Sequence, residues 1–116
     1  MNLRCELEDP DVLVVYLREG DVETSVSVSP AAAGARSMRR AIEAALEIGY
    51  GECFWPGRPG GQYWWIFKRD AETLETIAMW TRGGAALWEH VFRASDSAAH
   101  VHQLVVDEID RLKIVR

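Results

Sequence analysis

The sequence predicts an α+β fold, a two-layer sandwich in which two amphipathic helices cover a mainly antiparallel sheet in the order ββα-ββββ-α. Three observations predict it: an alternating strand pair near the N-terminus, two apolar stripes at helical spacing, and a run of aromatic-rich strands between the stripes. The chain has 116 residues, the usual length of one domain, and contains no repeat or linker. We therefore expect a single domain over residues 1–116.

The first element is a hairpin, in which residues 11–18 and 22–29 pair across Gly20-Asp21. Glycine followed by aspartate suits a two-residue type II′ turn, which places Arg18 opposite Glu23. Valine or threonine alternates with serine or glutamate along the second strand. This pattern predicts one buried face, with the valines and the threonine, and one solvent-exposed face. Residues 3–8 extend the first strand as far as Pro10 allows. The register buries Leu13, Val15 and Leu17 and leaves Val14 and Tyr16 on the wet face.

Two helices are expected. Ser29-Pro30 is a start signal, but the first helix begins either there or at Ser37, because Gly34 weakens its first turn. It ends at Gly49. The final helix is capped by Ser95 or Asp96. Its apolar face comprises Ala98, Val101, Val105, Ile109 and Leu112.

The aromatic residues lie in four predicted strands, at 52–55, 62–69, 74–81 and 86–93, the last two joined by Gly83-Gly84. Pairing residue 69 with 74 and residue 82 with 85 divides the last three strands into two faces. The predicted core face carries Trp64, Ile66, Lys68, Glu75, Ile77, Met79, Trp88, His90 and Phe92. The predicted open face carries Tyr63, Trp65, Phe67, Arg69, Leu74, Thr76, Ala78, Trp80, Leu87, Glu89, Val91 and Arg93. A slip of one residue exchanges partners between the faces.

Charge excludes one class of partner. Residues 1–29 hold seven acidic residues against Arg4 and Arg18, a net charge of −5, while the whole chain also sums to −5. Without a basic stripe, nucleic acid is a poor ligand. No apolar run reaches the roughly 20 residues of a membrane span, and the charged first residues are no signal peptide, so we expect a cytoplasmic protein without membrane contact.

No constellation for chemistry stands out. His100 and His102 are two residues apart on a helix and point in different directions, so neither a metal nor another cofactor is expected. Cys5 and Cys53 belong to no paired motif and are expected to be reduced thiols, unless the fold joins them in an oxidising compartment. The loop 57–61 lacks the lysine and the strand-to-helix setting of a phosphate loop.

These features favour a non-enzymatic protein-interaction module, in concrete form a small bacterial immunity-type inhibitor of one toxin partner. The partner is another protein, a basic one if the acidic hairpin faces it, or a second copy of the chain. The residues expected to bind it are Tyr16, Glu19, Asp21, Glu23, Tyr63, Trp65 and Trp80. One alternative is a small-molecule binder or enzyme with a pocket lined by Cys53, Trp88, Glu89 and His90. The other is a homo-oligomeric accessory protein.

Overall fold

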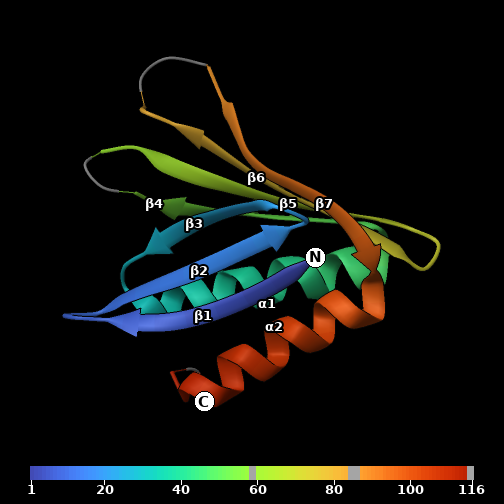
Figure 1. Cartoon of the computed structure of the whole chain (residues 1–116), viewed down its shortest axis with the longest axis horizontal. Coiled ribbons are helices and arrows are strands. Elements are labelled where there is room, and N and C mark those ends of the chain that lie inside the picture. The colour runs from blue at the N-terminus through green and yellow to red at the C-terminus, as the bar shows by residue number, and fades with distance from the viewer. Residues whose placement is uncertain (58–59, 84–86, 115–116) are drawn as a thin grey trace.

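The computed structural model describes residues 1–57, 60–83 and 87–114 and shows seven strands and two helices (Figure 1). The elements are β1 Asn2–Glu8, β2 Val12–Glu19, β3 Val22–Val28, α1 Ala31–Ile48, β4 Tyr50–Pro56, β5 Gln62–Asp70, β6 Thr73–Thr81, β7 Glu89–Ser97 and α2 Ala98–Leu112. The predicted α+β class and antiparallel pairing are confirmed. Parts of the predicted loop 57–61, of the Gly83-Gly84 connection and of the strand 86–93 lie outside the described residues.

The first sheet has the strand order β1-β2-β3, and its hairpin forms as predicted. Gly20, with φ 60°, occupies the turn, and Arg18 pairs with Glu23. Residues 2–8 form a separate strand rather than an extension of β2. The predicted inward residues Leu13, Val15 and Leu17 are buried. Val14, predicted on the wet face, is also buried, because it lies on the central strand between two flanking strands.

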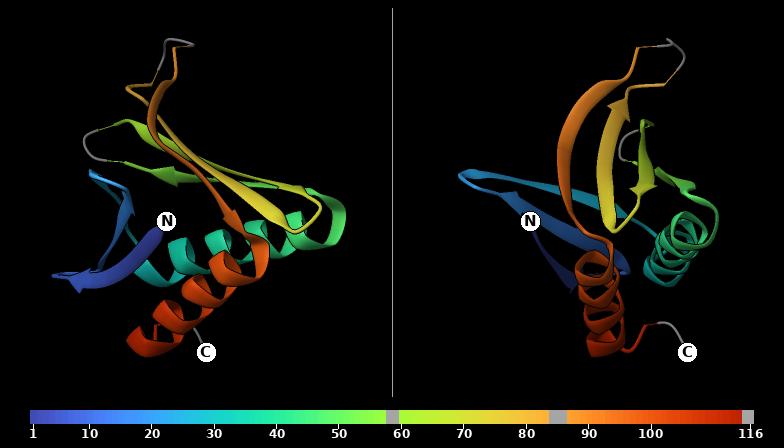
Figure 2. Two further views of the ribbon diagram at one scale, coloured as in Figure 1. Left: turned by 45° about the vertical axis from the view of Figure 1, so that its right-hand side comes forward. Right: turned by 90° about the vertical axis from the view of Figure 1, so that its right-hand side faces the viewer.

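The second sheet has the strand order β4-β5-β6-β7, and both helices lie on one side of it (Figure 2). Helix α1 packs mainly against β4, while α2 packs against β1 and reaches β6 and β7. A Cβ atom at Gly51 of β4 would lie 1.8 Å from the carbonyl oxygen of Ala41 in α1. Glycine at this position therefore allows strand and helix backbones to touch. Side chains from both sheets and both helices form one core.

Helix α1 begins close to the earlier of its two predicted starts. Its first residue is Ala31, and its N-cap is Pro30, which has no side chain that can accept a hydrogen bond. The Oδ1 atom of Asp11, in the loop before β2, accepts a hydrogen bond from the Ala31 N–H at 3.3 Å and takes that role. At the other end, Gly49 adopts φ 90° and ends the helix as predicted.

The cap of α2 differs from the prediction. Strand β7 continues to Ser97, so neither Ser95 nor Asp96 is the N-cap. Ser97 caps the helix instead, its Oγ atom accepting a hydrogen bond from the His100 N–H at 3.3 Å. Four of the five residues predicted for the apolar face of α2 are buried: Ala98, Val101, Val105 and Ile109.

The predicted core and open faces of the second sheet are reversed. Trp65 and Phe67, placed on the open face, are 0% and 1% exposed and face the helices, whereas Trp64 is only half-buried. The pairing of residue 69 with 74 is confirmed, so the prediction of which residues share a face of β5 and β6 is correct. The prediction of which face the helices cover is wrong.

The last pairing was wrong as well. Pairing residue 82 with 85 would place Phe92 opposite Glu75, but Phe92 lies opposite Ala78, and Ser95 lies opposite Glu75. A bulge between Ala78 and Met79 changes the register along β7. Phe92 therefore points to the helix side and is buried there.

Candidate protein-binding surface

The face of the second sheet that points away from both helices carries three large rings that pack on one another. Phe54 of β4 stacks on Trp64 of β5 with 5.6 Å between ring centroids. Trp88, just before β7, lies 5.3 Å from Trp64 and 6.3 Å from Phe54. We call these three residues the outer aromatic cluster. Phe54 is 45% exposed, and Trp64 and Trp88 are half-buried.

The cluster lies beside an aliphatic strip on the same face. Ile66 and Ile77 pair across β5 and β6 and are only 7% and 6% exposed, although no helix covers them. Met79 pairs with Trp64 and is half-buried. The Nε1 atom of Trp64 is buried and donates to no acceptor among the described residues. The cluster and the strip thus form an apolar region of this face, and one buried donor within it has no acceptor among the described residues.

The other end of the same face is charged. Arg93 of β7 and Glu75 of β6 form an ion pair with 2.6 Å between Nη2 and Oε2. The Tyr50 hydroxyl donates to the Glu52 carboxylate in β4, and this hydrogen bond raises the pKa of Tyr50. Lys68 of β5 is exposed beside them. One end of this face is therefore apolar and the other end is polar and charged. Protein interfaces likewise combine an apolar centre with a polar rim.

Of the aromatic residues predicted to bind a partner, Trp65 does not reach the surface. It is fully buried, with its ring 5.2 Å from Trp55, so its predicted exposure is wrong. Tyr63 and Trp80 are half-buried and contact each other at 4.6 Å between ring centroids. A Cβ atom at Gly61 would lie 2.3 Å from the Trp80 ring, so this ring packs directly against the backbone at the end of the 57–61 loop.

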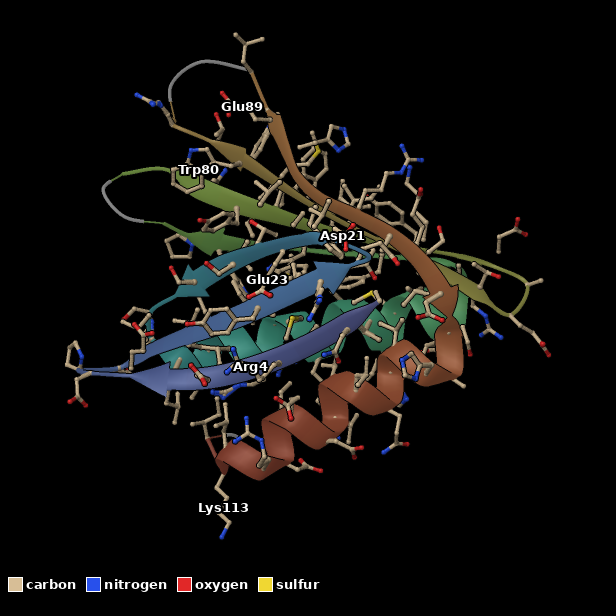
Figure 3. All side chains as sticks on the ribbon, viewed as in Figure 1. Arg4, Asp21, Glu23, Trp80, Glu89 and Lys113 are labelled. Carbon is tan, nitrogen blue, oxygen red and sulfur yellow. The ribbon has the colours of Figure 1, made fainter. Side chains whose placement is uncertain are left out.

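The remaining predicted binding residues lie on the β2–β3 hairpin of the first sheet, and Figure 3 shows two of them, Asp21 and Glu23, away from Trp80. Tyr16 is half-buried, and the Arg4 guanidinium lies 4.4 Å above its ring. The acidic residues Glu19, Asp21 and Glu23 are all exposed at the tip of the β2–β3 hairpin. This tip approaches the edge of the second sheet, because Glu19 and Val22 line a shallow groove together with residues 90–93 of β7.

The residues proposed to line an enzymatic pocket are not brought together. Cys53 packs against the core on the helix side of β4, whereas His90 is exposed and pairs with Met79, which faces away from the helices. Burial raises the pKa of the Cys53 thiol to about 12. A hydrogen bond with Ser37 lowers this pKa and the Glu52 charge raises it, and both effects are smaller than that of burial. The Cys53 thiol is therefore protonated at neutral pH and does not pair with His90 as a nucleophile and its base.

Cys5 is likewise a free, fully buried thiol, and burial followed by the Glu108 charge raises its pKa to about 12. Within the described ranges, no three histidine, cysteine or acidic side chains gather closely enough to hold a metal ion. No helix in that part of the chain combines the length and apolar character required to cross a membrane.

Sequence reasoning missed Phe54 and placed Trp64 and Trp88 in the core. A signal was present at Gly51 on the opposite face, where the absence of a Cβ atom lets the α1 backbone approach β4 closely. Comparison with protein-family models, curated proteins and solved structures finds no match to this chain.

Proposed function

We propose that this chain acts by binding another protein through the outer aromatic cluster. The observation that carries the proposal is the packing of Phe54, Trp64 and Trp88 on a sheet face that neither helix covers. Tryptophan is among the residues that dominate binding energy at interfaces, where a partner excludes water from its ring. Contiguous apolar patches of this kind mark interaction sites.

Two rings of the cluster are also held in place before any partner arrives. Phe54 and Trp64 belong to paired strands, and Phe54 lies directly opposite Trp64 in that pairing. Rings fixed by a sheet lose less conformational entropy on binding than rings on a free loop. The polar end with Glu75 and Arg93 supplies the charged rim that orients a partner.

The concrete form of the proposal is a small bacterial immunity-type inhibitor that occludes one toxin. The exposed carboxylates of Glu19, Asp21 and Glu23 beside β7 support a partner that is basic at that edge. Such charges mainly speed association, and salt screens their effect. The exposed aromatic surface supports the inhibitor role because occlusion needs contact area and no chemistry on the inhibitor.

The test compares variants of the full chain as bait in an extract of the source cells, followed by affinity measurements on the purified partner. Trp64→Ala or Trp88→Ala should weaken binding by about 2 kcal/mol, or roughly thirtyfold in Kd. Ile48→Ala, which removes a 77%-exposed side chain at the end of α1, is the matched control and should bind normally. Equal binding by all these variants would refute the proposal.

Light scattering on the purified chain separates the homo-oligomeric alternative. We expect a monomer whose mass does not change in Trp64→Ala. A wild-type dimer that dissociates in Trp64→Ala would instead assign the cluster to self-association, leaving no free surface for another protein.

A further inference from the structure

A second apolar site adjoins the outer aromatic cluster at the β4 edge of the sheet. It is a groove of about 260 Å³ between the start of α1, the end of β3 and the end of β4. Phe54 belongs to both features, since it stacks on Trp64 and also lines the groove. Apart from two serines, the lining is apolar and includes Val28, Pro30, Ala33, Trp55 and Pro56.

Hydrogen bonds fix one wall of the groove. The Nε1 atom of Trp55 donates to the Gly34 carbonyl oxygen at 3.1 Å and to the Ser37 hydroxyl at 3.0 Å, which ties β4 to α1. A Cβ atom at Gly34 would lie 2.1 Å from a methyl group of Val28, so α1 and β3 are also in close contact here. The groove therefore exists in the free protein and needs no rearrangement to be filled.

Its volume points to a single side chain as the occupant. A cavity of about 150 Å³ already accommodates benzene, whereas pockets for drug-sized molecules begin at about 300 Å³. A groove of about 260 Å³ lies between these limits. One leucine, phenylalanine or similar side chain is of the right size to fill it.

The charges beside the groove specify the surroundings of that side chain. Ala33 and Ser37 line the groove. Arg36 lies three residues after Ala33, and Arg40 three residues after Ser37, so both arginines share one side of α1 with the residues that line the groove. Both arginines are exposed. Neither has an acidic partner within 4.0 Å among the residues that the structure describes, whereas Arg39 on the α2 side has two, Glu43 and Asp110.

We infer that the groove receives one apolar side chain from an acidic segment of the binding partner, with the carboxylates of that segment paired to Arg36 and Arg40. The inference rests on the proposed function, because Phe54 joins this groove to the cluster that the same partner covers. It also predicts a partner with two charge zones, acidic at the β4 edge and basic beside the hairpin tip at the β7 edge.

The probe is a library of random short peptides displayed on phage and selected on the full chain. We expect enriched peptides to share one large apolar residue next to aspartate or glutamate. Ala33→Phe, which fills the groove from an exposed helix position, should weaken their binding by roughly tenfold or more. The double variant Arg36→Glu, Arg40→Glu should do the same, and added salt should weaken binding to the wild type.

Ala99→Phe places the same ring on an exposed position of α2 and is the matched control, expected to bind as the wild type does. Circular dichroism of each variant checks the fold. Enrichment of basic peptides, undiminished binding to Ala33→Phe, or no enrichment would each overturn the inference. These outcomes differ from failure of the proposed function, in which Trp64→Ala leaves affinity for the native partner unchanged.

Discussion

The two faces of the four-stranded sheet carry similar aromatic groups but have different environments. On the helix side, Trp55, Trp65 and Phe67 are at most 1% exposed. On the outer side, Phe54 is 45% exposed and Trp64 remains half-buried. Since tryptophan and phenylalanine occur on both faces, aromatic content does not determine which face is covered.

The small residues make the difference. The helix side contains Gly51, Ala78 and Ala94, and at Gly51 the strand lies against the α1 backbone with no room for a Cβ atom. The outer side carries the Glu75–Arg93 ion pair. A helix can pack closely where small residues leave space, but covering that ion pair would remove it from water at a cost.

The largest expected effect comes from truncating one ring on each face. Trp65→Ala should lower the free energy of unfolding by about 3–5 kcal/mol, because it leaves a cavity in the core. Trp64→Ala should cost about 1–2 kcal/mol, because its ring is half-exposed and its buried Nε1 lacks a partner among the described residues. Urea unfolding followed by circular dichroism measures both. Equal losses would show that the two faces are equally covered.

The close approach at Gly51 can be tested next. Gly51→Ala should destabilise the protein by about 1–3 kcal/mol, because the added methyl group collides with the Ala41 carbonyl oxygen and separates β4 from α1. Glu52→Ala, one residue on and on the outer face, should change stability by about 0.5 kcal/mol or less. Thermal unfolding of the two variants provides the comparison. A neutral Gly51→Ala would mean that α1 does not need this gap.

On the helix side, even an edge of the first sheet is closed by charged groups from α2. The Glu108 carboxylate accepts a hydrogen bond from the Cys5 N–H at 2.7 Å, and Arg111 donates to the Cys5 carbonyl oxygen. Burial alone would raise the pKa of Glu108, but the hydrogen bonds from Arg111 and Cys5 outweigh it, and the net pKa lies below 4.5. Both polar groups of Cys5 on the outer edge of β1 are thus occupied, which blocks pairing with another strand there.

The sign of the resulting pH dependence follows from that lowered pKa. Glu108 stabilises the fold at pH values above its pKa in the unfolded chain. This contribution is lost as the pH falls through its lower pKa in the folded protein. Glu108→Gln should therefore cost about 1 kcal/mol at neutral pH and progressively less below pH 4.5. Urea unfolding across this range would show it. A constant difference at all pH values would mean that the charge of Glu108 contributes nothing.

Local patterns predicted much of this fold. The alternation in residues 22–28 and the turn at Gly20 defined the hairpin, and the apolar stripe with Gly49 defined α1, because these features depend on neighbours in sequence. The choice between the faces of the second sheet depends on where distant helices pack. Period-two alternation cannot decide it when both faces are aromatic.

The candidate surface was harder to predict for the same reason. The sequence directed attention to Trp65 and Trp80, which lie on the helix-side pleat, and away from Phe54 and Trp64. The groove beside β4 combines residues 28–37 with 54–56, which only the tertiary fold brings together. The charges of Arg36 and Arg40 were visible in the sequence, but their position beside a cavity was not.

The smallest expected change in stability is also the most informative about the outer face. Phe54 is 45% exposed and lies on an edge strand, so Phe54→Ala should lower the free energy of unfolding by about 1 kcal/mol or less. It removes one ring from the outer aromatic cluster and one wall of the groove at once. Affinity for the protein partner should therefore fall by more than the roughly thirtyfold expected for Trp64→Ala, although the fold is almost unchanged. Isothermal titration with the purified partner, beside urea unfolding of the same sample, measures both quantities. If Phe54→Ala weakens the free energy of binding by no more than it lowers the free energy of unfolding, the outer aromatic cluster is not a binding site for the partner.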